Sequence, residues 1–537
     1  MQKLGFAVCA LAIFSIPAWC DQGHHHELTE TEIGSVRFAT SCAKAVEKDF
    51  NRAVALLHSF QYEDTGRAFE EIGRKDPACA MAQWGVAMSH YHGLWNNGDT
   101  AAGRKAWGKA REVAAANPKT TAREKAYIEA LGVVYEDDGK DVFTHGAAFE
   151  QKMAALQAQY PDDTEAAIFH ALSLYIAASK TDKTFANNRK CGEILEPIFG
   201  KLPNHPGVAH YIIHCYDNPV LAQQGLKAAR AYAKIAPASA HANHMPSHIF
   251  TRVGSWEESV QSNKRSESIA ASAEPTSKNG EARDQRLHAM DYMEYAYLQS
   301  GRVADAKAVL SNLNDLAPVK GLSLTGDYAL AAIPARFAVE LGKWNEATQL
   351  EVRKDGVPWA QAISWMAIGL GSARSGNSKR AAEAEQALAQ LRDTAAKLDP
   401  YWSKQIEVQR QEVAAWIAQE SGDSAKAVTL MTAAADLEES MDKHAVTPGA
   451  VLPAREMLAQ LQMEQKHPQP ALDAFEAVLK IAPKRFNALY GAATAADAAG
   501  DATVAHRYFQ ELIEVSAGDE RPELVTARNK VATAAKN

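Results

Sequence analysis

A short pattern recurs along this chain and restricts it to a stack of paired helices. Each copy is a turn headed by glycine between two runs with helical spacing, and copies begin at Gly254, Gly301, Gly342, Gly376, Gly422 and Gly500. Near the C-terminus, Phe475 and Phe509 occupy equivalent places 34 residues apart. A two-helix unit of this size cannot bury its apolar face alone, so successive units must stack. The sequence therefore predicts an all-α solenoid.

The composition of the repeated units carries a resemblance to a known family. Small residues stand where paired helices would cross, an aromatic residue such as Phe475 lies near the start of the second helix, and a proline such as Pro483 ends it. The pattern resembles tetratricopeptide repeats (TPR). This resemblance implies a right-handed superhelix of TPR-like helix pairs, whose first helices line a concave groove.

Four longer stretches are similar to parts of large exported bacterial TPR proteins. They are residues 79–88, 210–219, 244–252 and 444–456. No activity is established for that group, so the resemblance implies fold and export and leaves function open. TPR proteins usually bind partners, which makes a protein or peptide in the groove the partner implied by analogy.

The first 20 residues have the organisation of a secretory signal peptide. Lys3 supplies a positive charge, residues 4–16 form a short apolar run, and Ala18 and Cys20 fit the small-residue cleavage site. A signal anchor is the alternative, but the run is short for a spanning helix of roughly 20 residues. No later segment of the sequence is apolar enough to cross a membrane. We therefore expect an exported protein, located in the periplasm.

The rest of the chain divides into four parts. Residues 21–43 form an N-terminal segment with a histidine tract at 24–26, residues 44–270 hold the N-terminal repeats, and residues 282–537 hold the C-terminal repeats. The polar residues 271–281 are a candidate linker between the two sets of repeats. Histidine and cysteine concentrate before this linker, so we expect the functional site in the N-terminal repeats.

Four cysteines remain after the signal peptide, in a compartment that permits disulfides. Cys42 and Cys79 lie near the starts of successive repeats, where parallel packing would bring them together, and Cys191 and Cys215 lie on consecutive helices. The sequence predicts the pairs Cys42–Cys79 and Cys191–Cys215. Buried free thiols are the alternative.

Net charge and absent motifs exclude several classes of function. The formal net charge of −8 disfavours nucleic acid and anionic membranes as partners. The chain has no glycine-rich phosphate loop, no Gly-x-Ser-x-Gly elbow, no Cys-x-x-Cys pair and no His-Glu-x-x-His helix. These absences disfavour a nucleotide enzyme, a serine hydrolase, a thioredoxin-like protein and a zincin.

Histidines supply the most specific signal. The chain has 18, and six of them fall between residues 205 and 248. His210 and His214 are four residues apart, so they share one helical face, and so do His244 and His248. The two pairs are offset by 34 residues, one repeat length. We therefore expect them at equivalent positions on adjacent, nearly parallel helices.

The TPR resemblance extends this candidate site. In its register, His210, His214, His241, His244 and His248 fall on positions that face the groove. The same register places further groove candidates at His58, His92, Asp217, Arg252, His288 and Asp291. Pro246 complicates the geometry, because the helix either begins near Met245, leaving His241 and His244 on the preceding loop, or is kinked.

Three functions fit these residues. In the first, neutral imidazoles converge from facing helices on Zn²⁺ or Cu²⁺, with Asp217 or Asp291 as a carboxylate ligand or as the partner that orients a histidine. The predicted metal ligands are His210, His214, His241, His244 and His248. The histidines are otherwise hydrogen-bonded groove residues of a metal-free scaffold for a protein or peptide. A metal-dependent enzyme using the same histidines is the third possibility.

Overall fold

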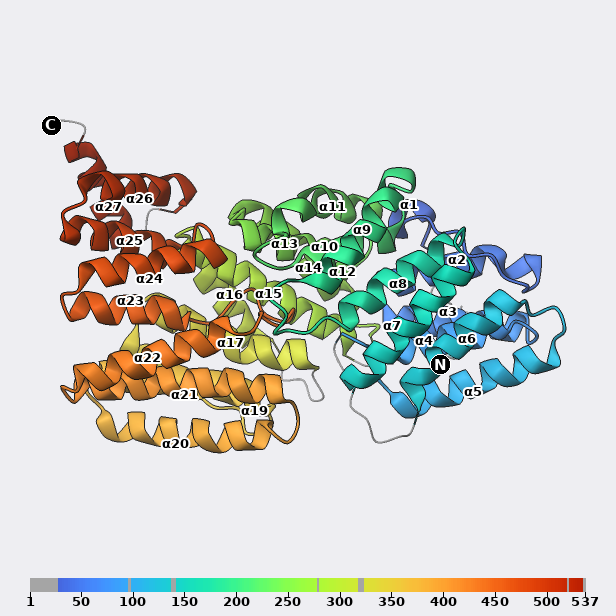
Figure 1. Cartoon of the computed structure of the whole chain (residues 1–537), viewed down its shortest axis with the longest axis horizontal. Coiled ribbons are helices and arrows are strands. Elements are labelled where there is room, and N and C mark those ends of the chain that lie inside the picture. The colour runs from blue at the N-terminus through green and yellow to red at the C-terminus, as the bar shows by residue number, and fades with distance from the viewer. Residues whose placement is uncertain are drawn as a thin grey trace, which may run out of the picture.

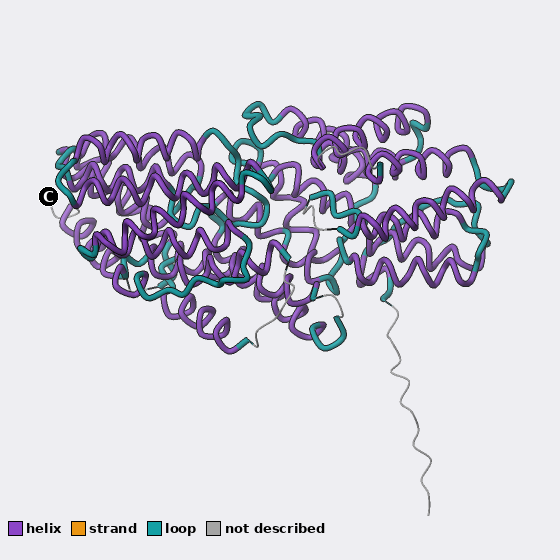
Figure 2. Tube along the Cα trace, turned by 90° about the horizontal axis from the view of Figure 1, so that it is seen from below, coloured by secondary structure: helices purple, strands orange, loops and turns teal. Residues whose placement is uncertain are grey.

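The computed structural model of this chain describes residues 28–94, 98–136, 142–277, 280–316, 323–518 and 521–534. These residues form 27 α-helices and two 3₁₀ helices, and no strand is found among them (Figure 2). The predicted signal peptide at 1–20 and the histidine tract at 24–26 lie outside the described residues. The all-α class predicted from the sequence is confirmed.

Helices of the N-terminal part run along one side of the molecule in Figure 1, and those of the C-terminal part along the other. The first set comprises α1 (Glu30–Ile33), η1 (Lys44–Val46), α2 (Glu47–His58), α3 (Tyr62–Lys75), α4 (Ala80–His90), α5 (Thr100–Ala116), α6 (Ala122–Gly132), η2 (Val133–Tyr135), α7 (Val142–Gln159), α8 (Thr164–Ile176), α9 (Ala186–Lys201), α10 (Pro206–Tyr216), α11 (Ala222–Ile235), α12 (Ala240–His244), α13 (Pro246–Val253) and α14 (Trp256–Ala273).

The second set comprises α15 (Glu281–Gln299), α16 (Val303–Asp315), α17 (Leu324–Glu340), α18 (Trp344–Ala347), α19 (Pro358–Arg374), α20 (Ser378–Ala395), α21 (Pro400–Glu420), α22 (Ser424–Glu439), α23 (Ala454–Glu464), α24 (Pro468–Ile481), α25 (Phe486–Ala499), α26 (Ala502–Val515) and α27 (Pro522–Ala534). Neighbours in the chain pack against each other throughout both sets, which gives the predicted solenoid of TPR-like helix pairs. Its handedness stays a prediction.

The recurring glycine turns explain how one helix ends and the next begins. Gly376, Gly422 and Gly500 have φ values of 78°, 87° and 87°, in the left-handed region that glycine adopts without steric cost. The residue after each glycine is Asn or Asp, and its side chain accepts a hydrogen bond from the first turn of the following helix. The sequence pattern therefore encodes a sharp turn between antiparallel helices.

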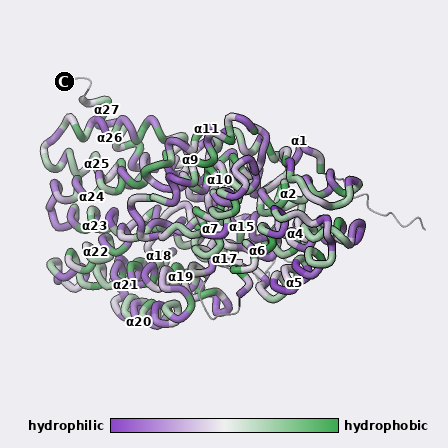
Figure 3. The backbone as a smooth tube through the Cα atoms, turned by 45° about the vertical axis from the view of Figure 1, so that its right-hand side comes forward, coloured by the Kyte–Doolittle hydropathy of each residue, from purple (hydrophilic) through white to green (hydrophobic). Residues whose placement is uncertain are grey.

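The small residues at the helix crossings are also explained by contact. Phe69 of α3 lies over Gly85 of α4, and 16 residues separate them, as they separate Phe475 of α24 from Gly491 of α25. A Cβ atom on either glycine would overlap the phenylalanine ring. Apolar and polar residues alternate along the helices, as the hydropathy colouring of Figure 3 shows, so each pair buries one face against its neighbours.

The predicted division of the chain at 271–281 stays a prediction. Helix α14 ends at Ala273 and α15 begins at Glu281, and these two helices pack against each other. Contacts also join residues far apart in the chain, because the indole N–H of Trp256 donates to the backbone oxygen of Lys484 at 3.1 Å. No helix among the described residues is long and apolar enough to span a bilayer.

Both predicted cysteine pairs lie at disulfide distance. The Cα atoms of Cys42 and Cys79 are 4.7 Å apart, and those of Cys191 and Cys215 are 6.0 Å apart. The first pair joins the segment before α2 to the start of α4, and the second joins α9 to α10, the helix that carries His210 and His214.

Replacing both Cys42 and Cys79 by alanine should lower the free energy of unfolding by about 2–4 kcal/mol, because a crosslink restricts the unfolded chain. Urea unfolding of the oxidised wild type and the double variant measures the difference. A reducing agent should destabilise the wild type and leave the variant affected only through Cys191–Cys215. Equal stability of the two oxidised proteins would show that Cys42 and Cys79 are free thiols.

Candidate metal centre

Six histidines from four helices meet in the interior of the molecule. His210 and His214 come from α10, His241 and His244 from α12, His248 from α13 and His288 from α15. All six are buried, and none exposes more than 7% of its surface. The five histidines predicted as metal ligands are therefore brought together, and His288, predicted as a groove residue, joins them.

The helix break at Pro246 places three of these side chains. Pro246 is the first residue of α13, where its missing N–H is tolerated, and Met245 keeps helical dihedral angles between α12 and α13. The structure shows the kinked alternative, since His241 and His244 lie on the short helix α12 and not on a loop.

The histidines form two groups of three. In the first triad, which we define as His210, His214 and His241, the Nε2 atom of His210 lies 3.0 Å from Nε2 of His214 and 3.0 Å from Nε2 of His241. In the second triad, His244, His248 and His288, the Nε2 atoms of His244 and His248 are 3.0 Å apart. Within each triad one nitrogen from every ring lies within 4.8 Å of the others.

In three of the rings, Nδ1 makes a hydrogen bond to an oxygen outside the triad. This bond fixes the direction in which Nε2 of the same ring presents its lone pair. His210 Nδ1 lies 2.6 Å from the backbone oxygen of His58, His248 Nδ1 lies 2.9 Å from a carboxylate oxygen of Asp217, and His244 Nδ1 lies 2.7 Å from Oδ1 of Asn263. Carbonyl and carboxylate oxygens only accept hydrogen bonds, so each Nδ1 is the donor.

Asn263 holds its orientation because its own amide N–H donates to the backbone oxygen of Ser259 at 2.8 Å. In a neutral imidazole with the proton on Nδ1, Nε2 carries a lone pair. The Nε2 atoms of His244 and His248 therefore face each other at 3.0 Å with no proton between them.

Burial keeps these rings neutral. Removal from water lowers the pKa of His210, His214, His241, His244 and His288 well below the ordinary value of 6.5, and neighbouring imidazoles lower it further. The pKa of His248 is also lowered by burial, against the opposing effect of Asp217. Near neutral pH these rings therefore carry no additional proton that two facing nitrogens could share.

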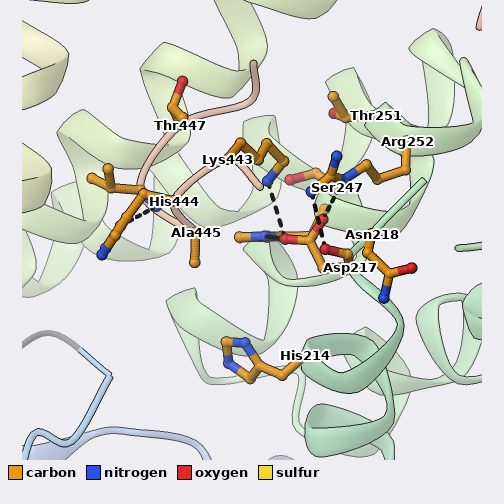
Figure 4. Close-up of polar contacts among 12 residues, drawn as sticks. His214, Asp217, Asn218, Ser247, Thr251, Arg252, Lys443, His444, Ala445 and Thr447 are labelled. Atoms are coloured by element: carbon orange, nitrogen blue, oxygen red, sulfur yellow. Dashed lines mark hydrogen bonds and ion pairs between the residues drawn. The ribbon is translucent and has the colours of Figure 1, made fainter. Parts of the chain in front are cut away.

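Asp217 links the second triad to a loop from the C-terminal part of the chain. Its carboxylate accepts from His248, from Arg252 Nε at 2.8 Å and from Lys443 Nζ at 3.1 Å. Figure 4 shows Lys443 reaching Asp217 from the loop between α22 and α23 and Arg252 reaching it from α13. Burial alone would raise the pKa of Asp217, but Lys443 and Arg252 hold it well below its ordinary value.

The remaining predicted groove residues lie outside the triads. Arg252 contacts Asp217, as described. His58 is buried between Tyr211 and Glu165, each 2.9 Å from one of its ring nitrogens, and it joins the site only through its backbone oxygen. His92 stacks on Tyr62 with ring centroids 4.0 Å apart. Asp291 accepts from Arg336 at 2.5 Å and belongs to neither triad.

A third group with suitable side chains is already satisfied by hydrogen bonds. Glu165 lies between His58 and His205, at 2.9 Å from a ring nitrogen of each. Burial opposes ionisation of Glu165, but His205 and His58 hold its pKa far below the ordinary value. This carboxylate pairs the two imidazoles, so the group forms a structural network.

Sequence reasoning missed two residues of the site. Asn263 of α14 orients His244. Lys443 contacts Asp217, although the two residues are 226 positions apart in the chain. Asn263 falls within an ordinary amphipathic helix, and no spacing relates it to the histidine pairs. The stretch 444–456 is similar to part of the large exported TPR proteins. That similarity drew attention to the loop next to Lys443 but did not indicate which residue Lys443 contacts.

Neither a known protein family nor a curated protein sequence matches this chain. Solved structures that resemble it include a chain of the APC/C hetero-tetramer Cut9–Hcn1, with 12% identity and a TM-score of 0.31, covering 91% of this chain and 89% of that one. The human IFIT1 dimer with PPP-AAAA has 12% identity and a TM-score of 0.34, covering 87% and 90%. A monomeric IFIT1 mutant with Gppp-AAAA has 10% identity and a TM-score of 0.37, covering 81% and 90%.

Proposed function

We propose that this chain is an exported helical-repeat protein that binds a transition metal, Zn²⁺ or Cu²⁺, through its buried histidines. The observation that carries the proposal is the pair of Nε2 lone pairs of His244 and His248, which face each other at 3.0 Å. Two nitrogens bound to one ion at about 2.0–2.1 Å are roughly 2.8–3.4 Å apart for bond angles between 90° and 109°. A metal ion between these rings turns an unfavourable contact into two bonds.

The groups behind the rings support the same proposal. Histidine ligands of metals usually donate their second N–H to a carboxylate, a backbone carbonyl or another oxygen. Asp217, the backbone oxygen of His58 and Asn263 take these three roles for His248, His210 and His244. Neutral imidazoles with depressed pKa values also suit Zn²⁺ and Cu²⁺, since no proton has to leave before the ion binds.

Export is part of the proposal. It rests on the signal-peptide pattern of residues 1–20 and on two cysteine pairs at disulfide distance, which are typical of oxidising compartments. Binding of a protein or peptide partner remains the competing function of the same scaffold.

Metal analysis of protein purified without chelators, followed by Zn²⁺ and Cu²⁺ titration, tests the proposal. We expect tight uptake by the wild type. In the double variant His214→Gln plus His288→Gln, which removes one ligand from each triad, the loss of affinity should exceed the roughly 10- to 100-fold that follows removal of a group hydrogen-bonded to a ligand.

His170→Gln is the matched control, because His170 is a buried histidine outside both triads, hydrogen-bonded to Gln157 and Glu150. This variant should bind metal like the wild type. A wild-type protein that contains no metal as purified and takes up none on titration would leave the metal-free scaffold as the function.

A further inference from the structure

The two triads are copies of one arrangement. Each takes two ligands from histidines four residues apart and a third from the next helix of the same layer. A shift of 34 residues carries His210 onto His244 and His214 onto His248. The third members, His241 and His288, each come from the second helix along the chain, α12 after α10 and α11 for the first triad and α15 after α13 and α14 for the second. Repetition of the helix pair has thus repeated the two-histidine pair, and a later helix completes each set of three imidazoles, although His241 and His288 are 47 residues apart rather than 34.

The two copies lie side by side and share a helix. His241 and His244 are three residues apart on α12 but belong to different triads, and their ring centroids are 6.3 Å apart. His214 and His248 form a second contact between the triads, also at 6.3 Å. Within the triads, the closest rings have centroids 4.2–4.9 Å apart. Two pairs within the triads, His214–His241 and His248–His288, have centroids as far apart as the pairs between the triads, at 6.4 and 6.1 Å. It is the ring nitrogens that separate the ligands into two adjacent sets, because one nitrogen from each ring of a triad lies within 4.8 Å of the others.

Each triad also borders the same cavity. A cavity of about 660 Å³ is lined by His241 of the first triad and His288 of the second. Its wall carries Glu63, Glu70, Asp99, Glu281 and Asp284 against the single guanidinium of Arg67. Burial raises the pKa of Glu281 to about 8 and that of Asp284 to about 6, so Glu281 is largely protonated near neutral pH. The remaining carboxylates still outnumber Arg67, and such a surplus raises the local concentration of cations.

Both nitrogens of His288 are buried without a hydrogen-bond partner among the described residues, and so is Nδ1 of His214. Unsatisfied buried nitrogens are costly, and a bound ion satisfies them. Three protein ligands also leave at least one coordination position of each ion for a ligand that the protein does not supply.

We propose that the two triads hold two metal ions as one dinuclear centre, which opens to the acidic cavity at His241 and His288 and accepts a small anion between the ions. This inference rests on the proposed metal binding. Two-metal sites hold their ions about 3.5–4 Å apart, a spacing that one small ligand bridges. The two triads share α12 and have rings in contact, so two such sites would lie side by side.

Cu²⁺ titration combined with electron paramagnetic resonance tests the nuclearity on the intact wild-type chain. We expect two Cu²⁺ per chain and a spin count well below the copper content, because two bridged Cu²⁺ ions couple magnetically. Azide, used as the probe anion, should bind with one azide for every two Cu²⁺. One Cu²⁺ per chain, or two with full spin count and one azide each, would overturn the dinuclear centre while leaving metal binding intact. Uptake of neither Cu²⁺ nor Zn²⁺ would instead overturn the proposed function.

Two single variants locate the ions. His214→Gln removes a ligand of the first triad and His288→Gln removes one of the second, and neither histidine hydrogen-bonds to a described residue outside its triad. Each variant should keep one Cu²⁺ and regain the full spin count of an isolated ion. If each variant lost both ions at once while its metal-free form melted at the temperature of the metal-free wild type, the six histidines would form one site and the proposal would be wrong.

Discussion

Replacing Asp217 by asparagine should weaken metal binding about 10- to 100-fold and lower the free energy of unfolding by about 3–5 kcal/mol. The first effect follows from the hydrogen bond that Asp217 accepts from His248, which fixes the ring and raises its basicity. The second follows because Arg252 and Lys443 are buried against this one carboxylate. Asparagine keeps the shape and removes the charge, so two buried cations lose their shared partner.

Asp442→Asn is the control for the Asp217 prediction. Asp442 pairs with Arg252 at 3.1 Å from the same loop that carries Lys443, but it contacts no histidine of the triads. We expect a smaller loss of stability and unchanged metal affinity. Urea unfolding measures the first quantity and competition with a chelator measures the second. Equal metal affinity in the Asp217 variant and the wild type would show that Asp217 does not orient a ligand.

The sequence-based prediction and the structure differ in how the histidines are grouped. Spacing alone identified the pairs His210–His214 and His244–His248, because contacts between residues four apart follow from helix geometry. It treated His241 and His288 as additions to a single site. The break between α12 and α13 at Pro246 turns His241 toward α10 and leaves His244 beside His288, so the histidines separate into two sets. Pro246 indicated a kink as one of two alternatives, but neither the proline nor the periodicity shows toward which helix each ring turns.

The general fold was predictable from the sequence, because a short local pattern specifies each turn. A glycine with left-handed dihedral angles followed by a capping residue, as at Gly422 and Asp423, specifies an antiparallel pair without help from distant parts of the chain. The loop that brings Lys443 to Asp217 depends on contacts between distant residues. One of them is the bond from the backbone N–H of Asp442 to the backbone oxygen of Lys180 at 2.8 Å. No repeat rule specifies such a contact.

Replacing Arg485 by methionine should lower the free energy of unfolding by about 3–5 kcal/mol without changing metal affinity. Arg485, which immediately precedes α25, is fully buried between Glu340 of α17 and Glu456 of α23, with contacts of 2.5 Å and 2.7 Å. Methionine fills much of the same volume but leaves two carboxylates buried without their cation. Because the triads lie on α10, α12, α13 and α15, the metal sites should keep their affinity.

The triple variant Arg485→Met, Glu340→Gln and Glu456→Gln separates charge from packing. With all three charges gone, no buried ion is left unpaired, so most of the stability lost in the single variant should return. Urea unfolding of the two variants and the wild type makes the comparison. If the triple variant were as unstable as Arg485→Met alone, the loss would come from packing at the meeting point of α17, α23 and α25. If it recovered, the loss in the single variant would come from the two carboxylates left without a cation, because these charges are costly to bury unless all three meet.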